Sequence, residues 1–228
     1  MAVFGRLDPP RGAVVVHGGA KPWVTHASLQ AWSFEDTVEL RGKYGKPLIY
    51  NEVGYEGDIP EGWGNLTAEQ LVDRFWQGAA GGAYVGHGET YQHEQDILWW
   101  SKGGVLHGQS PPRLAFLREV LESLPVREMA PDRTFSPGNV AVVKPGEAYL
   151  VYFTKEGLAA LELAGESIYR VDAIDPWAMT IAPLDDAEAG LLEYVPPRTQ
   201  TALRLVAYHP DEPRRPRAAA PARERPNA

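Results

Sequence analysis

Apolar and polar positions follow two different periods along the first half of the chain. Three short apolar runs are typical of strands: PWVTHASLQ (22–30), PLIYNE (47–52) and GAYVGHGE (82–89). Three other stretches predict helices, because apolar residues recur in them every three or four positions: 34–45, 67–80 and 112–124. Thr67, followed by Gln70, matches a capping box at the start of the second helix. This alternation predicts βαβ units and a parallel sheet.

The pattern changes after Pro125 to short segments rich in β-branched and aromatic residues, separated by turn material such as PGE and KEG. Five of these segments are predicted strands: 139–144, 148–154, 167–175, 178–184 and 201–208. Their spacing predicts a small antiparallel β-sandwich. The expected organisation has four parts: an atypical segment (1–20) with a short strand around AVVVHGG, a β/α part (21–128), the β-sandwich (134–209) and a tail (210–228). The tail is rich in Pro, Arg and Ala, so we expect it to be disordered.

Composition narrows the classes of function. The 228 residues carry a formal net charge of -8, which argues against nucleic acid or an anionic membrane as the main partner. The absence of Cys excludes disulfides and thiolate metal sites. The sequence shows neither the pattern of a signal peptide nor an apolar stretch long enough for a membrane span, so we expect a cytoplasmic protein.

Unusual side chains gather at the predicted strand ends, where ligands meet parallel sheets. In strand order they are Trp23, His26 and Gln30; Asn51 and Glu52; and His87, Glu89 and Tyr91. A glutamate directly after an apolar strand costs several kcal/mol if it is buried without partners. We therefore expect Glu52 either as an ordinary solvated loop carboxylate or as a group held for a purpose.

Aromatic residues in the following loops favour the second interpretation. They are Tyr55, Trp63, Trp99 and Trp100. Aromatic faces beside carboxylates, amides and imidazoles suit sugars, whose C–H faces stack on rings while their hydroxyls form hydrogen bonds. Trp76 lies on the second helix and is predicted to pack in the core, and the Trp99–Trp100 pair fits either role.

A metal site is a weaker alternative for the same region. His87, Glu89 and His93 offer nitrogen and oxygen ligands. Their spacing matches no helical pair such as H-E-x-x-H, so we predict neither a metal nor a cofactor.

Three strings of the sequence carry a family resemblance: KPWVTHASLQ, the stretch from KPLIYNEVGYEGDIPEGWGN to GHGETY, and DILWWSKGGVLHGQSPPRLAFL. They resemble the closing part of a family of candidate bacterial glycoside hydrolases, which are similar to retaining (β/α)8 barrel enzymes with two catalytic glutamates and carry a small C-terminal β-sandwich. The resemblance covers residues 21–208. It implies an α/β plus all-β fold, with about strands six to eight of an incomplete barrel followed by the sandwich.

The resemblance also implies roles. The nucleophile, at the end of the seventh barrel strand, corresponds to Glu52. The acid/base glutamate, which follows an Asn at the end of the fourth strand, has no counterpart, because Asn51–Glu52 is the only Asn-Glu pair in the chain. Glu89 is then a substitute acid or a residue that orients substrate, while Tyr55 or His87 holds Glu52.

The resulting hypothesis is a fragment of a retaining glycoside hydrolase that acts on O-glycosidic bonds and is inactive alone. Its ligand is a carbohydrate, which His26 and Asn51 help to bind. The alternative is a non-catalytic carbohydrate-binding or interaction module. An incomplete barrel leaves an unpaired edge at strand six, which predicts self-association or pairing with a missing N-terminal half.

Overall fold

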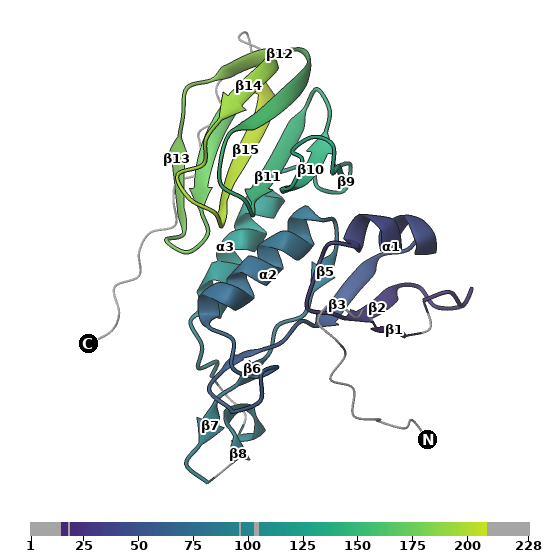
Figure 1. Cartoon of the computed structure of the whole chain (residues 1–228), viewed down its shortest axis with the longest axis vertical. Coiled ribbons are helices and arrows are strands. Elements are labelled where there is room, and N and C mark those ends of the chain that lie inside the picture. The colour runs from purple at the N-terminus through teal and green to yellow at the C-terminus, as the bar shows by residue number, and fades with distance from the viewer. Residues whose placement is uncertain (1–14, 18, 96, 103–104, 209–228) are drawn as a thin grey trace. The chain divides into compact units, whose positions relative to one another are not determined.

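The computed structural model describes residues 15–17, 19–95, 97–102 and 105–208 (Figure 1). The chain divides into two compact units, residues 1–115 and 116–228. The predicted tail (210–228) and residues 1–14 lie outside the described residues. The domain limits expected from the sequence stay predictions.

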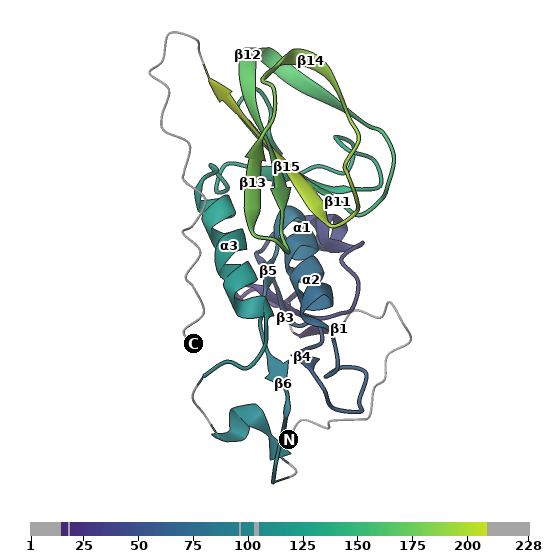
Figure 2. The ribbon, with the colours of Figure 1, turned by 90° about the vertical axis from the view of Figure 1, so that its left-hand side faces the viewer.

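The first unit is built on a four-stranded sheet with the order β1-β2-β3-β5 (Figures 1 and 2). Its strands are β1 (Val15–His17), β2 (Ala27–Gln30), β3 (Leu48–Glu52) and β5 (Tyr84–Val85). β2, β3 and β5 run parallel to one another, as the alternating pattern predicts. The helices α1 (Thr37–Tyr44) and α2 (Ala68–Ala80) lie between these strands in the sequence and give the expected β/α order.

β1 changes the expected picture of the sheet edge. It pairs with β2 in antiparallel orientation, and Val15 lies opposite Gln30. The sequence predicts an unpaired edge at the strand that is β2 in the structure. That prediction is wrong, because β1 pairs with this edge.

One face of the sheet forms the core of the first unit. Leu29, Leu48 and Tyr50 alternate with more exposed neighbours and are fully buried. They pack with Leu71 of α2 and with partly buried residues of α1. α2 begins as predicted: the Thr67 side chain accepts a hydrogen bond from the Gln70 N–H, and the Gln70 side chain accepts one from the Thr67 N–H.

Two small pairings extend the loops beyond the sheet. They are the parallel pair β4 (Glu56–Gly57) and β6 (Glu89–Thr90), and the antiparallel pair β7 (Gln92–His93) and β8 (Ile97–Leu98). A short 3-10 helix, η1 (Trp99–Lys102), leads toward α3 (Ser110–Glu122). None of the described helices combines the length and the apolar character needed to cross a membrane.

The second unit holds a seven-stranded antiparallel sheet with the order β13-β12-β15-β11-β10-β9, and β14 pairs with β12 (Figures 1 and 2). The strands are β9 (Ala130–Pro131), β10 (Val140–Lys144), β11 (Ala148–Phe153), β12 (Ala159–Asp175), β13 (Thr180–Pro183), β14 (Ala187–Tyr194) and β15 (Thr201–Tyr208). The fold is thus a parallel β/α segment followed by an antiparallel sheet, as predicted, and the described residues form no closed barrel.

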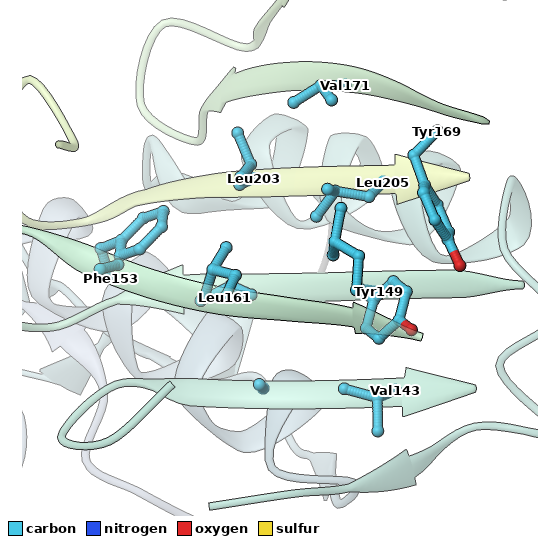
Figure 3. Packing of buried hydrophobic residues seen from close by; sticks show 12 residues of the cluster. Val143, Tyr149, Phe153, Leu161, Tyr169, Val171, Leu203 and Leu205 are labelled. Atoms are coloured by element: carbon cyan, nitrogen blue, oxygen red, sulfur yellow. The ribbon is translucent and has the colours of Figure 1, made fainter. Parts of the chain in front are cut away.

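The 17-residue strand β12 gives this sheet its core. Its first half pairs with β14 and its second half with β15, and the register shifts between Leu163 and Ile168. Residues of both halves, Leu161 and Tyr169 among them, enter one buried cluster with residues of β10, β11 and β15 (Figure 3). Both halves of β12 therefore contribute side chains to the same core.

Two tyrosines hold the irregular part of β12. The Tyr149 hydroxyl accepts hydrogen bonds of 3.0 Å from the Ala164 N–H and from the Gly146 N–H. The Tyr169 hydroxyl donates to the Ala164 carbonyl oxygen. Both rings are buried and meet edge to face at 5.6 Å between centroids (Figure 3). The register shift is thus fixed by side chains rather than by regular strand pairing.

Candidate functional site

The site begins at the carboxyl end of β3, where a register shift changes the face that Glu52 occupies. Leu29 of β2 lies opposite Tyr50, but Gln30 lies opposite Glu52, so Asn51 is an additional residue on β3. A bulge of this kind re-aims the side chain that follows it. Glu52 takes the register position beside Gln30, whereas Leu29 and Tyr50 face the core. The structure thus brings together Gln30, Asn51 and Glu52 at one strand end.

Backbone contacts fix the chain on both sides of Glu52. The Glu52 carbonyl oxygen accepts a hydrogen bond of 3.2 Å from the Ala31 N–H at the end of β2. The next carbonyl, that of Val53, accepts a hydrogen bond from the Arg74 guanidinium of α2. Gly54 follows with φ +82°, a conformation that L side chains rarely adopt. The carboxylate itself is exposed.

Tyr55 is the titratable neighbour that the structure couples to Glu52. Burial raises the pKa of the Tyr55 hydroxyl, and the Glu52 charge raises it further, so the phenol stays protonated at neutral pH. The ring meets Trp63 edge-on at 6.0 Å and 90°. A Cβ atom placed on Gly88 would lie 2.4 Å from the ring, so the backbone after β5 leaves room only for glycine. Tyr55, Trp63 and Glu52 therefore share this end of the sheet.

A second cluster centres on Glu56, which the sequence did not single out. Its side chain is 1% exposed and accepts four hydrogen bonds. Oε1 accepts from the Tyr91 hydroxyl (2.8 Å) and the Gln109 N–H (2.7 Å), and Oε2 from the Ser110 N–H (3.0 Å) and hydroxyl (2.5 Å). Burial alone would raise the pKa of Glu56, but these hydrogen bonds together hold it below its ordinary value.

Glu89 and His87 lie in the same cluster. Glu89 is 8% exposed and accepts hydrogen bonds from the His107 N–H (2.7 Å) and the Gly108 N–H (3.0 Å). His87 Nε2 lies 3.2 Å from the Ser110 hydroxyl and 3.9 Å from Glu89 Oε1. Burial lowers the pKa of His87, and the charges of Glu89 and Glu56 oppose this shift. The contacts tie the loop before α3 to the two strands β4 and β6.

The same three side chains have the composition of a metal site. One ligand atom from each of Glu56, His87 and Glu89 lies within 4.8 Å of the others. However, each Glu56 oxygen already accepts two donors, and both Glu89 oxygens accept backbone N–H groups. The partial positive charges of these donors stand where a cation would bind. The cluster is better explained as a closed hydrogen-bond network. The third ligand of the metal alternative drawn from the sequence, His93, lies outside this group.

The structure does not bring every predicted residue to Glu52. β2 begins at Ala27, so Trp23 and His26 precede the strand instead of ending it, and Ala27 lies opposite Leu48 at the start of β3. The side chains of Trp23 and His26 are exposed, and they lie at the end of the sheet opposite Glu52. Tyr91 bonds to Glu56. The side chains of Trp99 and Trp100 lie outside the described part of the chain.

Two residues near Glu52 were not anticipated. The Arg74 guanidinium packs against the face of the Trp32 ring, with its carbon atom 5.0 Å from the ring centroid. Burial lowers the pKa of Arg74, and Asp73 opposes this shift. Trp32 is close to the predicted end of its strand and could have been found there. Arg74 gave no signal, because it lies within an ordinary amphipathic helix.

Comparisons with known proteins support a glycoside hydrolase fold. No model of a protein family and no curated protein matches the sequence. Among solved structures, the chain is similar to a candidate glycoside hydrolase from Bacteroides vulgatus ATCC 8482, with 28% identity and a TM-score of 0.72. This similarity covers 85% of the present chain and 43% of the other.

Two further structures show the fold alone. A glycoside hydrolase family 5 protein from the same organism is 14% identical, with a TM-score of 0.65 and coverage of 82% of this chain and 51% of that one. A third protein, named only as a glycoside hydrolase, is 16% identical, with a TM-score of 0.59 and coverage of 82% and 53%. The chain thus spans about half the length of these proteins and resembles glycoside hydrolases over most of its own length.

Proposed function

We propose that this chain carries the nucleophile of a retaining glycoside hydrolase acting on O-glycosidic bonds, and that the nucleophile is Glu52. The observation that carries the proposal is the register shift at Asn51, which sets an exposed carboxylate beside Gln30 at the carboxyl end of a parallel strand. The 28% identity to a candidate glycoside hydrolase supports it. The partner carboxylate belongs, in this proposal, to a segment outside this chain.

The chemistry assigned to Glu52 is attack on the anomeric carbon. The carboxylate forms an ester bond to the sugar as the bond to the departing oxygen breaks, and water later hydrolyses that ester. The fixed carbonyls of Glu52 and Val53 hold the strand end in place for this attack. The protonated Tyr55 phenol adds no negative charge beside the carboxylate.

Among the described residues, the general acid is the part of this mechanism that is hardest to assign. Retaining enzymes place it about 5–5.5 Å from the nucleophile. Glu89, the candidate from the sequence, is buried and bonded through both oxygens to the loop before α3. Its contacts favour a structural role. We therefore propose that the chain alone does not cleave glycosides whose leaving groups need protonation.

The nucleophile can still be tested by itself, because 2,4-dinitrophenolate leaves without a proton. The full chain is incubated with 2,4-dinitrophenyl 2-deoxy-2-fluoroglycosides of glucose, xylose, mannose and galactose, and its intact mass is measured. We expect one sugar adduct, mapped to Glu52 by peptide mass spectrometry and absent in Glu52→Gln. Glu162→Gln, which changes an exposed glutamate of β12, should be labelled normally.

The engagement of Glu89 also favours the alternative of a carbohydrate-binding module without chemistry. In that case no fluoroglycoside labels the chain. Saccharide binding, measured by calorimetry, would then be equal in the unmodified chain and in Glu52→Gln. This pair of results would replace the enzymatic proposal with the binding one.

A further inference from the structure

Two exposed tryptophans stand at opposite ends of β2. Trp23 precedes the strand and is 76% exposed, whereas Trp32 follows it and is 43% exposed. Only the second one adjoins the proposed nucleophile: the N–H of its neighbour Ala31 donates to the Glu52 carbonyl oxygen at 3.2 Å. The parallel register places Trp23 beyond the other end of the same strands.

Trp32 has a fixed support beneath its ring. The Arg74 guanidinium carbon lies 5.0 Å from the ring centroid, within the range of a cation–π contact. The guanidinium is fixed in turn by its hydrogen bond to the Val53 carbonyl oxygen. One face of the indole is therefore occupied by Arg74, and the exposed area belongs to the remainder of the ring.

Trp23 offers a natural comparison. The Lys21 ammonium lies 5.8 Å from its ring centroid, so both tryptophans neighbour a cation. Lys21 and Trp23 are both exposed, however, and the flexible lysine chain holds the ring less firmly than the half-buried Arg74 holds Trp32. The two side chains thus differ in support and in distance from Glu52, and not in chemical type.

We propose that Trp32 is the stacking platform for a sugar ring at the Glu52 site. The free indole face would take the apolar C–H face of a pyranose, while the exposed Glu52 carboxylate approaches the same saccharide from the adjacent strand end. Arg74 positions the platform. This inference rests on the proposed role of Glu52 for the identity of the ligand, but stacking itself requires no bond cleavage.

The indole N–H resonances of the full chain test the platform directly. Trp32→Phe and Trp23→Phe assign the two signals in a heteronuclear NMR spectrum, and cellotetraose, xylotetraose and mannotetraose serve as probes. We expect at least one probe to shift the Trp32 signal and leave the Trp23 signal in place. Trp32→Ala should then weaken binding of that probe about tenfold, whereas Trp23→Ala should leave it unchanged.

The outcome separates this inference from the proposed function. If a probe binds Glu52→Gln as it binds the unmodified chain and still shifts the Trp32 signal, the platform is supported without reference to catalysis. If Glu52 is labelled by a fluoroglycoside but Trp32→Ala is labelled at the same rate and binds the tetrasaccharides equally, the platform is wrong while the nucleophile stands. If no tetrasaccharide shifts the Trp32 signal, the platform is also wrong.

Discussion

The Tyr91 hydroxyl donates a hydrogen bond of 2.8 Å to Oε1 of Glu56, a residue 35 positions earlier in the chain. The bond joins the strand pair β4–β6 to the loop that follows it. Two N–H groups just before and at the start of α3 donate to the same carboxylate. The buried Glu56 side chain therefore fixes both ends of the segment that contains β7, β8 and η1. It also accepts hydrogen bonds from N–H groups at the start of α3.

Glu56→Gln should destabilise the first unit. The substitution keeps the size of the side chain but turns one acceptor oxygen into a donor amide, which faces the N–H and O–H groups that now bond to the carboxylate. Hydrogen bonds to a charged group contribute about 1.5–3 kcal/mol, so we expect a loss of about 2–3 kcal/mol in the free energy of unfolding in urea. Glu61→Gln, at an exposed position, should change this value little. Equal stability of the two variants would contradict the assigned role.

The Glu56 contribution should depend on pH. Its pKa in the folded chain lies below the ordinary value, so folding favours the charged form. The stabilisation is complete above the pKa of an unfolded glutamate, about 4.3, and is lost as the pH falls through the lower pKa of the folded state. The positively charged Arg113 and the titratable His87 both interact electrostatically with the same carboxylate. The stability difference between the unmodified chain and Glu56→Gln should therefore shrink from pH 6 toward pH 3, and a difference that stays constant would exclude the carboxylate as its source.

Tyr149→Phe should lower the free energy of unfolding of the second unit, although the side chain loses only one oxygen atom. It removes the acceptor of the Gly146 and Ala164 N–H groups while leaving the ring in the core. Loss of these two partly buried hydrogen bonds should cost about 1–3 kcal/mol in the free energy of unfolding. Tyr194→Phe, a change at a partly buried tyrosine of β14, provides the control. Urea unfolding followed by near-UV circular dichroism measures both, and matching losses would argue against the hydrogen bonds as the cause.

The pair Asp172 and Arg204 should show strong coupling. Arg204 Nη2 lies 2.8 Å from Asp172 Oδ2, both side chains are about nine-tenths buried, and Arg204 Nη1 also donates to the Ser123 hydroxyl at 2.6 Å. Removing one partner leaves a buried charge, so Asp172→Leu or Arg204→Leu alone should cost about 3–5 kcal/mol. The double variant should recover much of that loss, because an apolar pair avoids the desolvation of two charges. Additive losses in a double-mutant cycle would show that the ion pair is not the relevant interaction.

Gly88→Ala should impair the Glu52 site without a direct contact to Glu52. The added methyl group would lie 2.4 Å from the Tyr55 ring, which must move away from its place against Trp63. We expect slower labelling of Glu52 by the fluoroglycoside that labels the unmodified chain, with the melting temperature as a check on folding. Gly62→Ala, where the added atom would meet nothing within 4 Å, should be labelled at the normal rate. Normal labelling of Gly88→Ala would show that the place of Tyr55 is unimportant.

The repeating patterns of the sequence predict most elements because those patterns depend on local residues. The capping box at Thr67 and the strands around Val142 and Leu203 are examples. β14 was missed because its Glu, Ala and Gly residues interrupt the apolar pattern, and pairing with β12 determines its conformation. α3 begins at Ser110, two residues before the predicted start, and the N–H groups of Gln109 and Ser110 find their acceptor in Glu56.

The site was less predictable than the fold for the same reason. Glu52 could be selected because a charge after an apolar strand is a local anomaly. Glu56 looked like an ordinary loop acid, since its partners lie 35 to 54 positions away. The register shift at Asn51 arises from the pairing of two strands, which no single stretch of sequence reveals. Trp23 was assigned to the site although it lies near the beginning of the predicted strand 22–30, and the structure places it before β2.

The antiparallel strand β1 has a consequence for any larger assembly. Because it occupies the outer edge of β2, a foreign strand cannot add there without first displacing it. Among the described strands of this sheet, the only other terminal position is β5, where Tyr84 is 67% exposed. Another polypeptide that extends this sheet would therefore have to pair with β1 or with β5, and not with β2 itself.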